Sequence, residues 1–201
     1  MQRIRVFFEL IFRYYYVLNL DLLKFNIPNS IELDGEFNFK ILAEEDLPYF
    51  SSFNKNNDYI DLCRSRLKCS DFVCFAIIHK KENLLVHYSW VNFSDKYRVK
   101  ELNKSIWLKK QQRVLFEDDN TLYQFRGLKL HSYVIKKRIN YSRSIGAKNA
   151  LIMIHPRNKV ALHTAKKMGF KRINLFPYFY REKSLSFLAH KLYTNVFSRT
   201  K

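Results

Sequence analysis

The chain has 201 residues and carries 36 Lys and Arg against 18 Asp and Glu, a formal net charge of +18. This length suits one domain of moderate size, and a hydrophobic share of 47% is enough to build a core, which excludes an intrinsically disordered protein. The positive field attracts nucleic acid, anionic lipid, phosphorylated cofactors and acidic carrier proteins alike, so charge alone does not select a partner.

The cysteines and histidines give no sign of a structural or metal framework. Cys63, Cys69 and Cys74 are odd in number and lack Cys-x-x-Cys spacing. This usage favours reduced thiols in a cytoplasmic protein. The histidines show no metal-ligand spacing either, so the sequence predicts no metal site.

The N-terminal segment Met1–Leu23 places apolar residues at helical spacing beside Arg3, Arg5 and Arg13. Charges of this kind are costly at bilayer depth, and no small-residue cleavage site follows, so neither a membrane span nor a signal peptide is expected. The spacing predicts an amphipathic helix within an extension formed by residues 1–30. That helix would pack on the domain or on a second subunit, or rest on an anionic membrane surface.

Residues 31–201 are expected to form the main domain, in which strand and helix patterns alternate along the chain. We expect strands at Glu36–Leu42, Asp71–His79, Leu84–Phe93, Arg113–Leu122, Asn149–Ile154, Phe170–Ile173 and Leu175–Tyr180, and helices at Glu44–Phe53, Asp58–Leu67, His131–Ser144 and Asn158–Met168. This order predicts an α/β (α+β) fold with a mixed sheet, helices on both faces and one right-handed strand–helix–strand crossover.

The most informative segment is the turn at Gln124–Leu130, between a strand and a helix. Backbone N–H groups at such a helix start lack partners, and the helix dipole adds partial positive charge, so the turn suits a diphosphate. Gly127 lets the backbone approach the ligand, while Arg126, Lys129 and His131 add donors or charge. An ordinary strand-to-helix turn has the same appearance when this fragment is considered alone.

The wider arrangement carries a family resemblance. Gln124–Lys129 resembles the acetyl-CoA motif Gln/Arg-x-x-Gly-x-Gly/Ala of the GNAT N-acetyltransferase superfamily, and Asn158-x-x-Ala and a Gly-Phe pair follow at the superfamily's spacing. The resemblance covers about Glu117–Phe170, and the strand order fits it back to Glu36. It implies a GNAT-like domain whose mixed, mostly antiparallel sheet is flanked by helices.

The resemblance also implies an enzyme that moves an acetyl or other acyl group from acyl-CoA to a primary amine. Thr121 and Leu122 would offer backbone groups to the pantetheine arm and the thioester, and Asn158 would orient the arm. The residues implied to surround the diphosphate are Gln124, Arg126, Gly127, Leu128, Lys129, Leu130 and His131. Two positions depart from the family pattern: Lys129 replaces a Gly or Ala, and Ala165 replaces a Tyr thought to protonate the leaving thiolate.

Direct acyl transfer needs a carboxylate that takes the proton of the ammonium. Three acids, Glu117, Asp118 and Asp119, precede the turn, and strand alternation puts the first and third on one face and the second on the other. We expect Glu117, and after it Asp119, to be the base. Ion pairs with the abundant Lys and Arg are the alternative.

The expected acceptor is the amine of a small molecule, and an amino sugar or a surface-polymer precursor is suggested by analogy alone. An acidic acyl carrier protein is a second donor that the positive field would attract. Two other readings stay open. A basic nucleic-acid-binding domain fits the charge and the many aromatic residues, although nucleic acid is not the partner we expect. A GNAT-like protein that binds CoA without catalysis fits Lys129 and Ala165.

Overall fold

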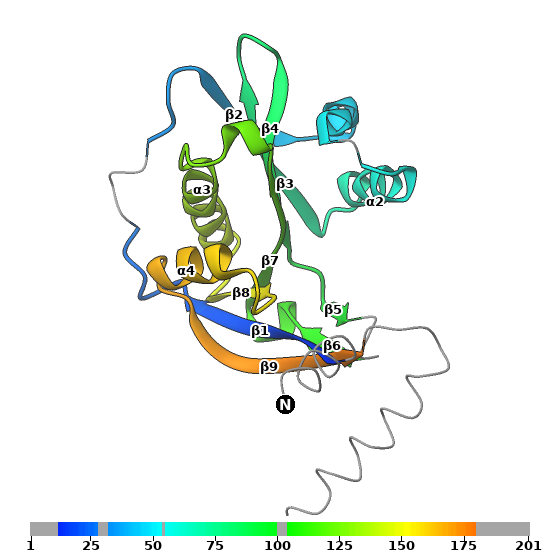
Figure 1. The fold of residues 1–201 in the computed structure, drawn as a ribbon. Helices are drawn as coiled ribbons and strands as arrows, with labels where there is room; N and C mark the ends of the chain where they lie inside the picture. Colours follow the sequence, from blue (N-terminus) through cyan, green and yellow to red (C-terminus); the bar gives the residue numbers. More distant parts are fainter. Residues whose placement is uncertain (1–11, 28–31, 54, 100–103, 180–201) are drawn as a thin grey trace, which may run out of the picture.

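The computed structural model describes residues 12–27, 32–53, 55–99 and 104–179, shown as a ribbon in Figure 1. Within these residues one sheet has the strand order β2-β3-β4-β7-β8-β1-β9. Its strands are β1 (Phe12–Asp21), β2 (Phe37–Leu42), β3 (Phe72–His79), β4 (Leu84–Asn92), β7 (Arg113–Thr121), β8 (Asn149–Ile154) and β9 (Lys171–Phe179). The pairing is antiparallel throughout except between β7 and β8, which are parallel, so the mixed, mostly antiparallel sheet is confirmed.

Helices cover both faces of the sheet, as expected (Figure 1). The α-helices α3 (Leu130–Ser144) and α4 (Lys159–Lys167) lie on one face, and the 3₁₀ helix η1 (Glu44–Phe53) and α2 (Asn57–Lys68) lie on the other. Short 3₁₀ turns η3 (Lys109–Gln111) and η4 (Tyr123–Phe125) precede β7 and α3, and β5 (Lys96–Val99) and β6 (Lys104–Trp107) form a separate hairpin.

Two hydrophobic clusters hold these layers together. On the α3 face, Val134 and Ile139 pack in one cluster with Phe75 and Phe116 of the sheet. On the α2 face, a second cluster includes the fully buried Trp90. The side chains of β3 pack in both clusters, one face of the strand in each, which is why its sequence contains almost no polar residue.

The predicted N-terminal helix is wrong over the residues that the structure describes. Phe12–Asp21 is strand β1, inserted between β8 and β9 and antiparallel to both. Val17 packs with Leu115 on one face of the sheet, while Leu18 joins the α3-side core on the other. A strand that is buried on both faces lacks simple alternation, and its apolar residues also satisfy a helical period.

The boundary drawn at residue 30 must be corrected in the same way, because β1 is an integral strand of the main domain. The membrane or subunit contact was expected of the whole N-terminal helix. Residues 1–11 of that helix, and residues 28–30 of the extension, lie outside the described part of the chain. Among the described helices, none combines the length and the apolarity that a membrane span requires.

The strands β7 and β8 are paired over only part of their length. Their parallel ladder runs from Arg113 opposite Asn149 to Phe116 opposite Ile152. β7 continues beyond this point to Thr121, paired on its other side with β4. From Glu117 onward, the β7 edge that faces β8 therefore has no strand partner within the described residues, which leaves backbone groups available to an extended ligand.

Candidate active site

The turn between β7 and α3 leaves several backbone amides without partners. The N–H groups of Gly127, Leu128 and Lys129 form no hydrogen bond with any described residue. The bond from Tyr133 N to Lys129 O, at 3.1 Å, is the earliest of the α3 ladder, and no side chain caps the helix. The partial positive charge of the helix start is thus left for a ligand.

The local backbone explains how the turn opens. Gly127 has φ +85°, and a Cβ added there would find nothing within 4 Å, so the space beside it is empty. Lys129 has φ +60°, the left-handed conformation that a glycine adopts without strain. A lysine in that conformation costs about 1 kcal/mol, and strain of this kind is typical of ligand-binding turns.

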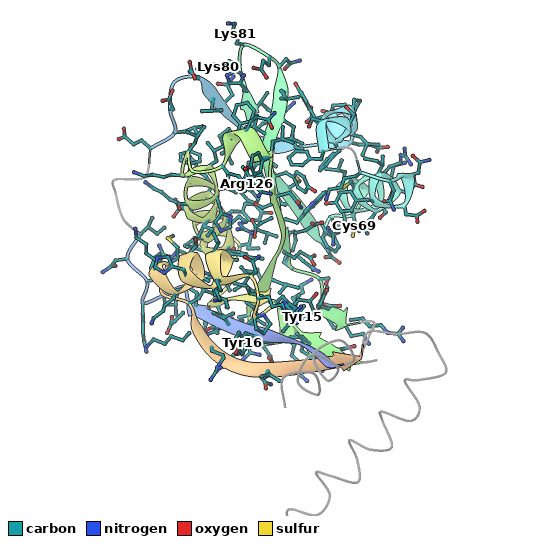
Figure 2. The ribbon with its side chains drawn as sticks, in the orientation of Figure 1. Tyr15, Tyr16, Cys69, Lys80, Lys81 and Arg126 are labelled. Carbon is teal, nitrogen blue, oxygen red and sulfur yellow. The ribbon has the colours of Figure 1, made fainter. Side chains whose placement is uncertain are left out.

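The side chains of the turn occupy different environments. Arg126 is exposed at the end of η4 (Figure 2), with its guanidinium 5.4 Å from the ring of Tyr123 and its Nε 3.5 Å from the carbonyl oxygen of Thr121. Gln124 and Leu128 are exposed as well. Leu130 is buried in the α3-side core and can offer only its backbone.

Two of the predicted cofactor residues have structural roles that the sequence did not reveal. The Leu122 amide donates to the Val86 carbonyl at 2.9 Å, so it is already satisfied. Asn158 caps α4, because its Oδ1 accepts a hydrogen bond from Ala161 N at 3.1 Å. The Asn-x-x-Ala spacing thus follows from helix capping, and contact between Asn158 and a cofactor stays a prediction.

The acid run does not follow strand alternation, and this corrects the expected arrangement of its side chains. Asp118 has φ +57° and forms a β-bulge, since Trp90 lies opposite Glu117 whereas Tyr88 lies opposite Asn120. The extra residue turns Glu117 and Asp118 to the α2 face, and Asp119 to the α3 face, as their ion-pair partners show.

On the α2 face, Glu117 is the carboxylate with the weaker contacts. Its Oε1 lies 3.3 Å from Asn92 Nδ2 and 3.5 Å from Arg66 Nη2. Asp118 instead accepts from Tyr59 Oη at 2.6 Å and from Arg66 Nη1 at 2.9 Å. Burial raises the pKa of Glu117, although the Arg66 charge opposes the rise. A raised pKa in a loosely held carboxylate suits a general base.

On the α3 face, Asp119 pairs with Arg138, whose Nη2 lies 2.8 Å from Asp119 Oδ1. Burial acts to raise the pKa of Asp119, but the charges of Arg138 and His131 outweigh it and hold the pKa well below its usual range. A carboxylate of this kind takes up a proton poorly, so Asp119 is less suited to the chemistry of a base than Glu117 is.

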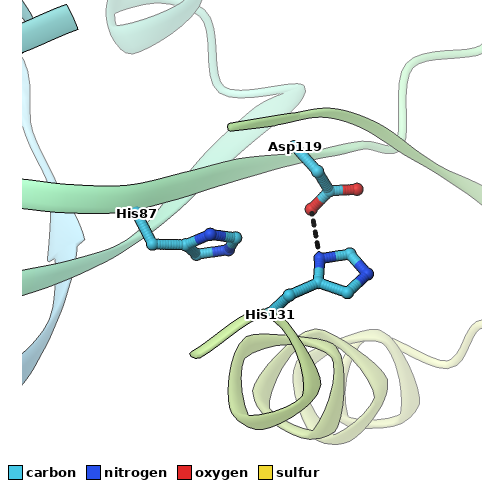
Figure 3. Close-up of side chains that lie close together, drawn as sticks. All are labelled: His87, Asp119 and His131. Carbon is cyan, nitrogen blue, oxygen red and sulfur yellow. Dashed lines mark ion pairs between the residues drawn. The ribbon is translucent and has the colours of Figure 1, made fainter. Parts of the chain in front are cut away.

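Two histidines lie beside Asp119 (Figure 3). His131, on the first turn of α3, places Nδ1 3.5 Å from Asp119 Oδ1. His87, on β4, is fully buried, with Nδ1 2.8 Å from Thr121 Oγ1, and burial lowers its pKa to about 3. Sequence reasoning missed this group because its members come from three separate elements and share no spacing.

Position 165 cannot supply a general acid. Ala165 has no hydroxyl and is buried in the α3-side core, so this position cannot protonate a leaving thiolate.

A concavity of about 670 Å³ lies away from the turn, between β1, α4 and β9. Tyr16 and Phe170 line it together with Lys166 and Arg172, and it contains none of the predicted site residues.

Comparison with known proteins gives different results for sequence and for structure. No protein-family model and no curated protein matches the sequence. Among solved structures, a Drosophila protein aligns with TM-score 0.60 at 11% identity, covering 89% of this chain and 56% of its own. A GCN5-related glucosamine N-acetyltransferase region of a fungal multi-domain β-N-acetylglucosaminidase aligns with TM-score 0.62 at 12% identity, covering 89% and 22%.

A third structure, an aminoglycoside N-acetyltransferase in complex with CoA, aligns with TM-score 0.53 at 13% identity, covering 73% of this chain and 99% of its own. This chain thus spans only about half of the Drosophila protein and about a fifth of the fungal one. Identities this low establish the fold alone, and that fold is the one of the GNAT acetyltransferases.

Proposed function

We propose that this protein is an N-acyltransferase that moves an acetyl or other acyl group from acyl-CoA to a primary amine. The observation that carries the proposal is the uncapped start of α3, where the amides of Gly127, Leu128 and Lys129 have no partner among the described residues. They lie directly after a strand whose edge is also unpaired. Acyl-CoA, when bound, supplies the activated thioester.

The chain's own groups divide the task of binding between them. The free amides and the positive end of α3 hold the diphosphate, and Arg126 and Lys129 add charge at the rim. The unpaired edge of β7 from Glu117 to Thr121 offers N–H and C=O groups to the pantetheine arm, as a sheet edge does to an added strand. Donors on that edge also stabilise negative charge on the thioester carbonyl oxygen.

The two faces of the sheet have separate roles in this proposal. α3 and the diphosphate turn lie on one face, whereas Glu117 points to the α2 face. The acceptor amine approaches from the α2 face, and Glu117 takes its proton so that the neutral amine attacks the thioester. Asn92 and Arg66 orient the Glu117 carboxylate through contacts of 3.3 Å and 3.5 Å, which are long enough to leave it available to the amine.

The acceptor class follows from the comparisons by analogy. Two of the matched structures act, by their names, on glucosamine and on aminoglycosides, so an amino sugar is the first acceptor class to test. A surface-polymer precursor is included in that class. The free thiols Cys63, Cys69 and Cys74 suit a reducing, cytoplasmic compartment, and the net positive charge leaves an acidic acyl carrier protein as an alternative donor.

Thermal-shift measurements with CoA and acetyl-CoA, followed by thiol release with a panel of amino sugars and other amines, test this function. We expect both CoA compounds to raise the melting temperature, and at least one amine to release thiol from acetyl-CoA. No shift at saturating CoA, combined with salt-sensitive binding of RNA or DNA, would instead identify the basic nucleic-acid-binding domain. A CoA shift without turnover on any amine or with any acyl donor would identify a CoA-binding protein that is not a catalyst.

A further inference from the structure

We propose that His87, Asp119 and His131 form a binding site for a divalent transition metal ion of the zinc type. One ligand atom from each residue lies within 4.8 Å of the other two. The three side chains reach this point from β4, β7 and α3 and turn toward one another (Figure 3). The proposal rests on this geometry and does not depend on acyl transfer.

The strongest support comes from a buried nitrogen that needs a partner. His87 Nε2 is inaccessible to solvent and forms no hydrogen bond with any described residue. Asp119 Oδ1, held by the ion pair with Arg138 Nη2 at 2.8 Å, is the carboxylate oxygen of the same group. Unsatisfied buried atoms are rare in native proteins, and a bound ion is one of the groups that accounts for them.

The surroundings of His87 match those of a metal ligand. Its Nδ1 lies 2.8 Å from Thr121 Oγ1, so the hydroxyl fixes the orientation of the ring and leaves Nε2 for the ion. Metal-binding histidines usually have their second nitrogen held in this way. The ring is fully buried between β4 and α3, so it brings its lone pair to the site with little freedom to turn away.

The distances require only a small movement. Ligand atoms of a tetrahedral zinc ion lie about 3.4 Å apart, given metal–ligand bonds of about 2.1 Å. His131 Nδ1 and Asp119 Oδ1 are already 3.5 Å apart. The side chain of His131 is 29% exposed on the first turn of α3, so rotation of this ring can close the longer distances and also gives the ion a way in.

The ligand chemistry selects the class of metal. Two imidazoles and one carboxylate suit zinc, cobalt, nickel or copper, whereas calcium and magnesium need more oxygen ligands. Arg138 neutralises the charge of Asp119, so the site has no net negative charge with which to attract a hard cation. The imidazole nitrogens therefore contribute most to metal binding. Of the two histidines His131 is the more exposed, and its replacement should weaken metal binding strongly.

The experiment uses the full chain without a histidine tag and with Cys69→Ser, because Cys69 is exposed and a thiolate is a competing ligand for zinc. After stripping with EDTA and removal of the chelator, zinc is titrated in competition with a chromophoric chelator, and cobalt is titrated by visible absorbance. We expect one ion per chain, and intense tetrahedral cobalt bands. His131→Ala should weaken zinc binding by at least about tenfold.

His163→Ala is the matched control, because His163 is an exposed histidine on α4, and it should bind zinc as the parent protein does. Zinc should raise the melting temperature of the parent and of His163→Ala, and should lose this effect in His131→Ala. Folding of His131→Ala is checked by its melting curve in EDTA. Equal zinc affinity in His131→Ala and the parent, or no stoichiometric binding at neutral pH, overturns the proposal.

Discussion

Arg138 Nη2 on α3 lies 2.8 Å from Asp119 Oδ1 on β7, and the side chain of Arg138 is entirely buried. The pair joins the helix that begins at the turn Gln124–Leu130 to the strand that leads into this turn. Because the guanidinium has no access to water, the Asp119 carboxylate is what makes its burial tolerable. The stability of the fold and the position of the turn therefore depend on the same contact.

Asp119→Asn should destabilise the protein strongly. Removing the carboxylate leaves Arg138 buried without a counter-ion, a loss of about 3–5 kcal/mol in the free energy of unfolding. Urea unfolding in EDTA measures it. The control is Asp61→Asn, which breaks the exposed ion pair with Arg64 and should cost less than about 1 kcal/mol. Similar losses in the two variants would show that Asp119 is not the counter-ion that Arg138 requires.

Gly127→Ala should weaken CoA binding more than it destabilises the fold. Gly127 and Gly146 both have positive φ and open space where a Cβ would lie, so an alanine at either position should cost about 1–2 kcal/mol of stability. Only the first borders the free amides. We expect about tenfold weaker CoA binding in Gly127→Ala and unchanged affinity in Gly146→Ala, measured by calorimetry. Equal affinities would remove the turn from the cofactor site.

Glu117→Gln should slow acyl transfer by about 100-fold or more and leave the CoA-induced thermal shift in place. The amide keeps the size of the side chain but cannot take a proton from the acceptor. Thiol release at neutral pH measures the rate. Glu44→Gln, at an exposed ion pair with Lys68, is the control and should keep the parent rate. Full activity in Glu117→Gln would assign the proton transfer to another group.

Acid should destabilise the protein through His87. Burial, the largest influence, lowers the folded-state pKa of His87 from 6.5 to about 3. Between these values the unfolded chain binds a proton that the folded protein excludes, so the free energy of unfolding falls as the pH drops from about 6.5 toward 3. Unfolding in EDTA at pH 7 and pH 5 measures the slope, and His87→Asn should flatten it. An unchanged slope would contradict the burial of a neutral imidazole.

Val17→Asp should prevent stable folding. In strand β1 this side chain is 3% exposed, in the cluster with Leu115 and Leu151, so a carboxylate there would be buried without a partner. Leu23→Asp, at a position that is 69% exposed, should leave the melting temperature nearly unchanged. The comparison separates the strand from an amphipathic helix, because Val17 is not among the residues that would form the apolar stripe of that helix, which are Ile4, Phe7, Phe8, Ile11, Tyr15, Leu18 and Leu22. A stable Val17→Asp protein would contradict the strand.

The sequence was sufficient to predict which helices and strands form between β7 and α4. The helix predicted at His131–Ser144 differs from α3 by one residue, and the strand Asn149–Ile154 is β8. These elements were predictable because each has a local signal: Gly127 before the helix, Gly146 after it and a short apolar run for the strand. The residues 94–110, which carry no such signal, hold the β5–β6 hairpin that the sequence did not predict.

Prediction from the sequence failed where one local feature interrupted the regular alternation of side chains along a strand. At Asp118, a single residue of positive φ changes which face each acid of the run points to, and no composition rule marks a bulge. The meeting of His87 with His131 depends on the pairing of strands and the packing of α3, which arise only in three dimensions. Patterns in the sequence indicate which residues are neighbours within one helix or strand. The side chains of the site come from several elements, so their meeting could not be predicted in this way.

The location of β1 constrains the order in which the molecule can assemble. Leu20 pairs with Ala150 and Tyr16 with Leu175, so β1 is synthesised well before either of the strands that it pairs with. Until β8 and β9 have left the ribosome, Val17 and Leu18 remain uncovered and prone to association with other chains. Contacts this distant in sequence favour slow folding, and chaperones would act during that wait.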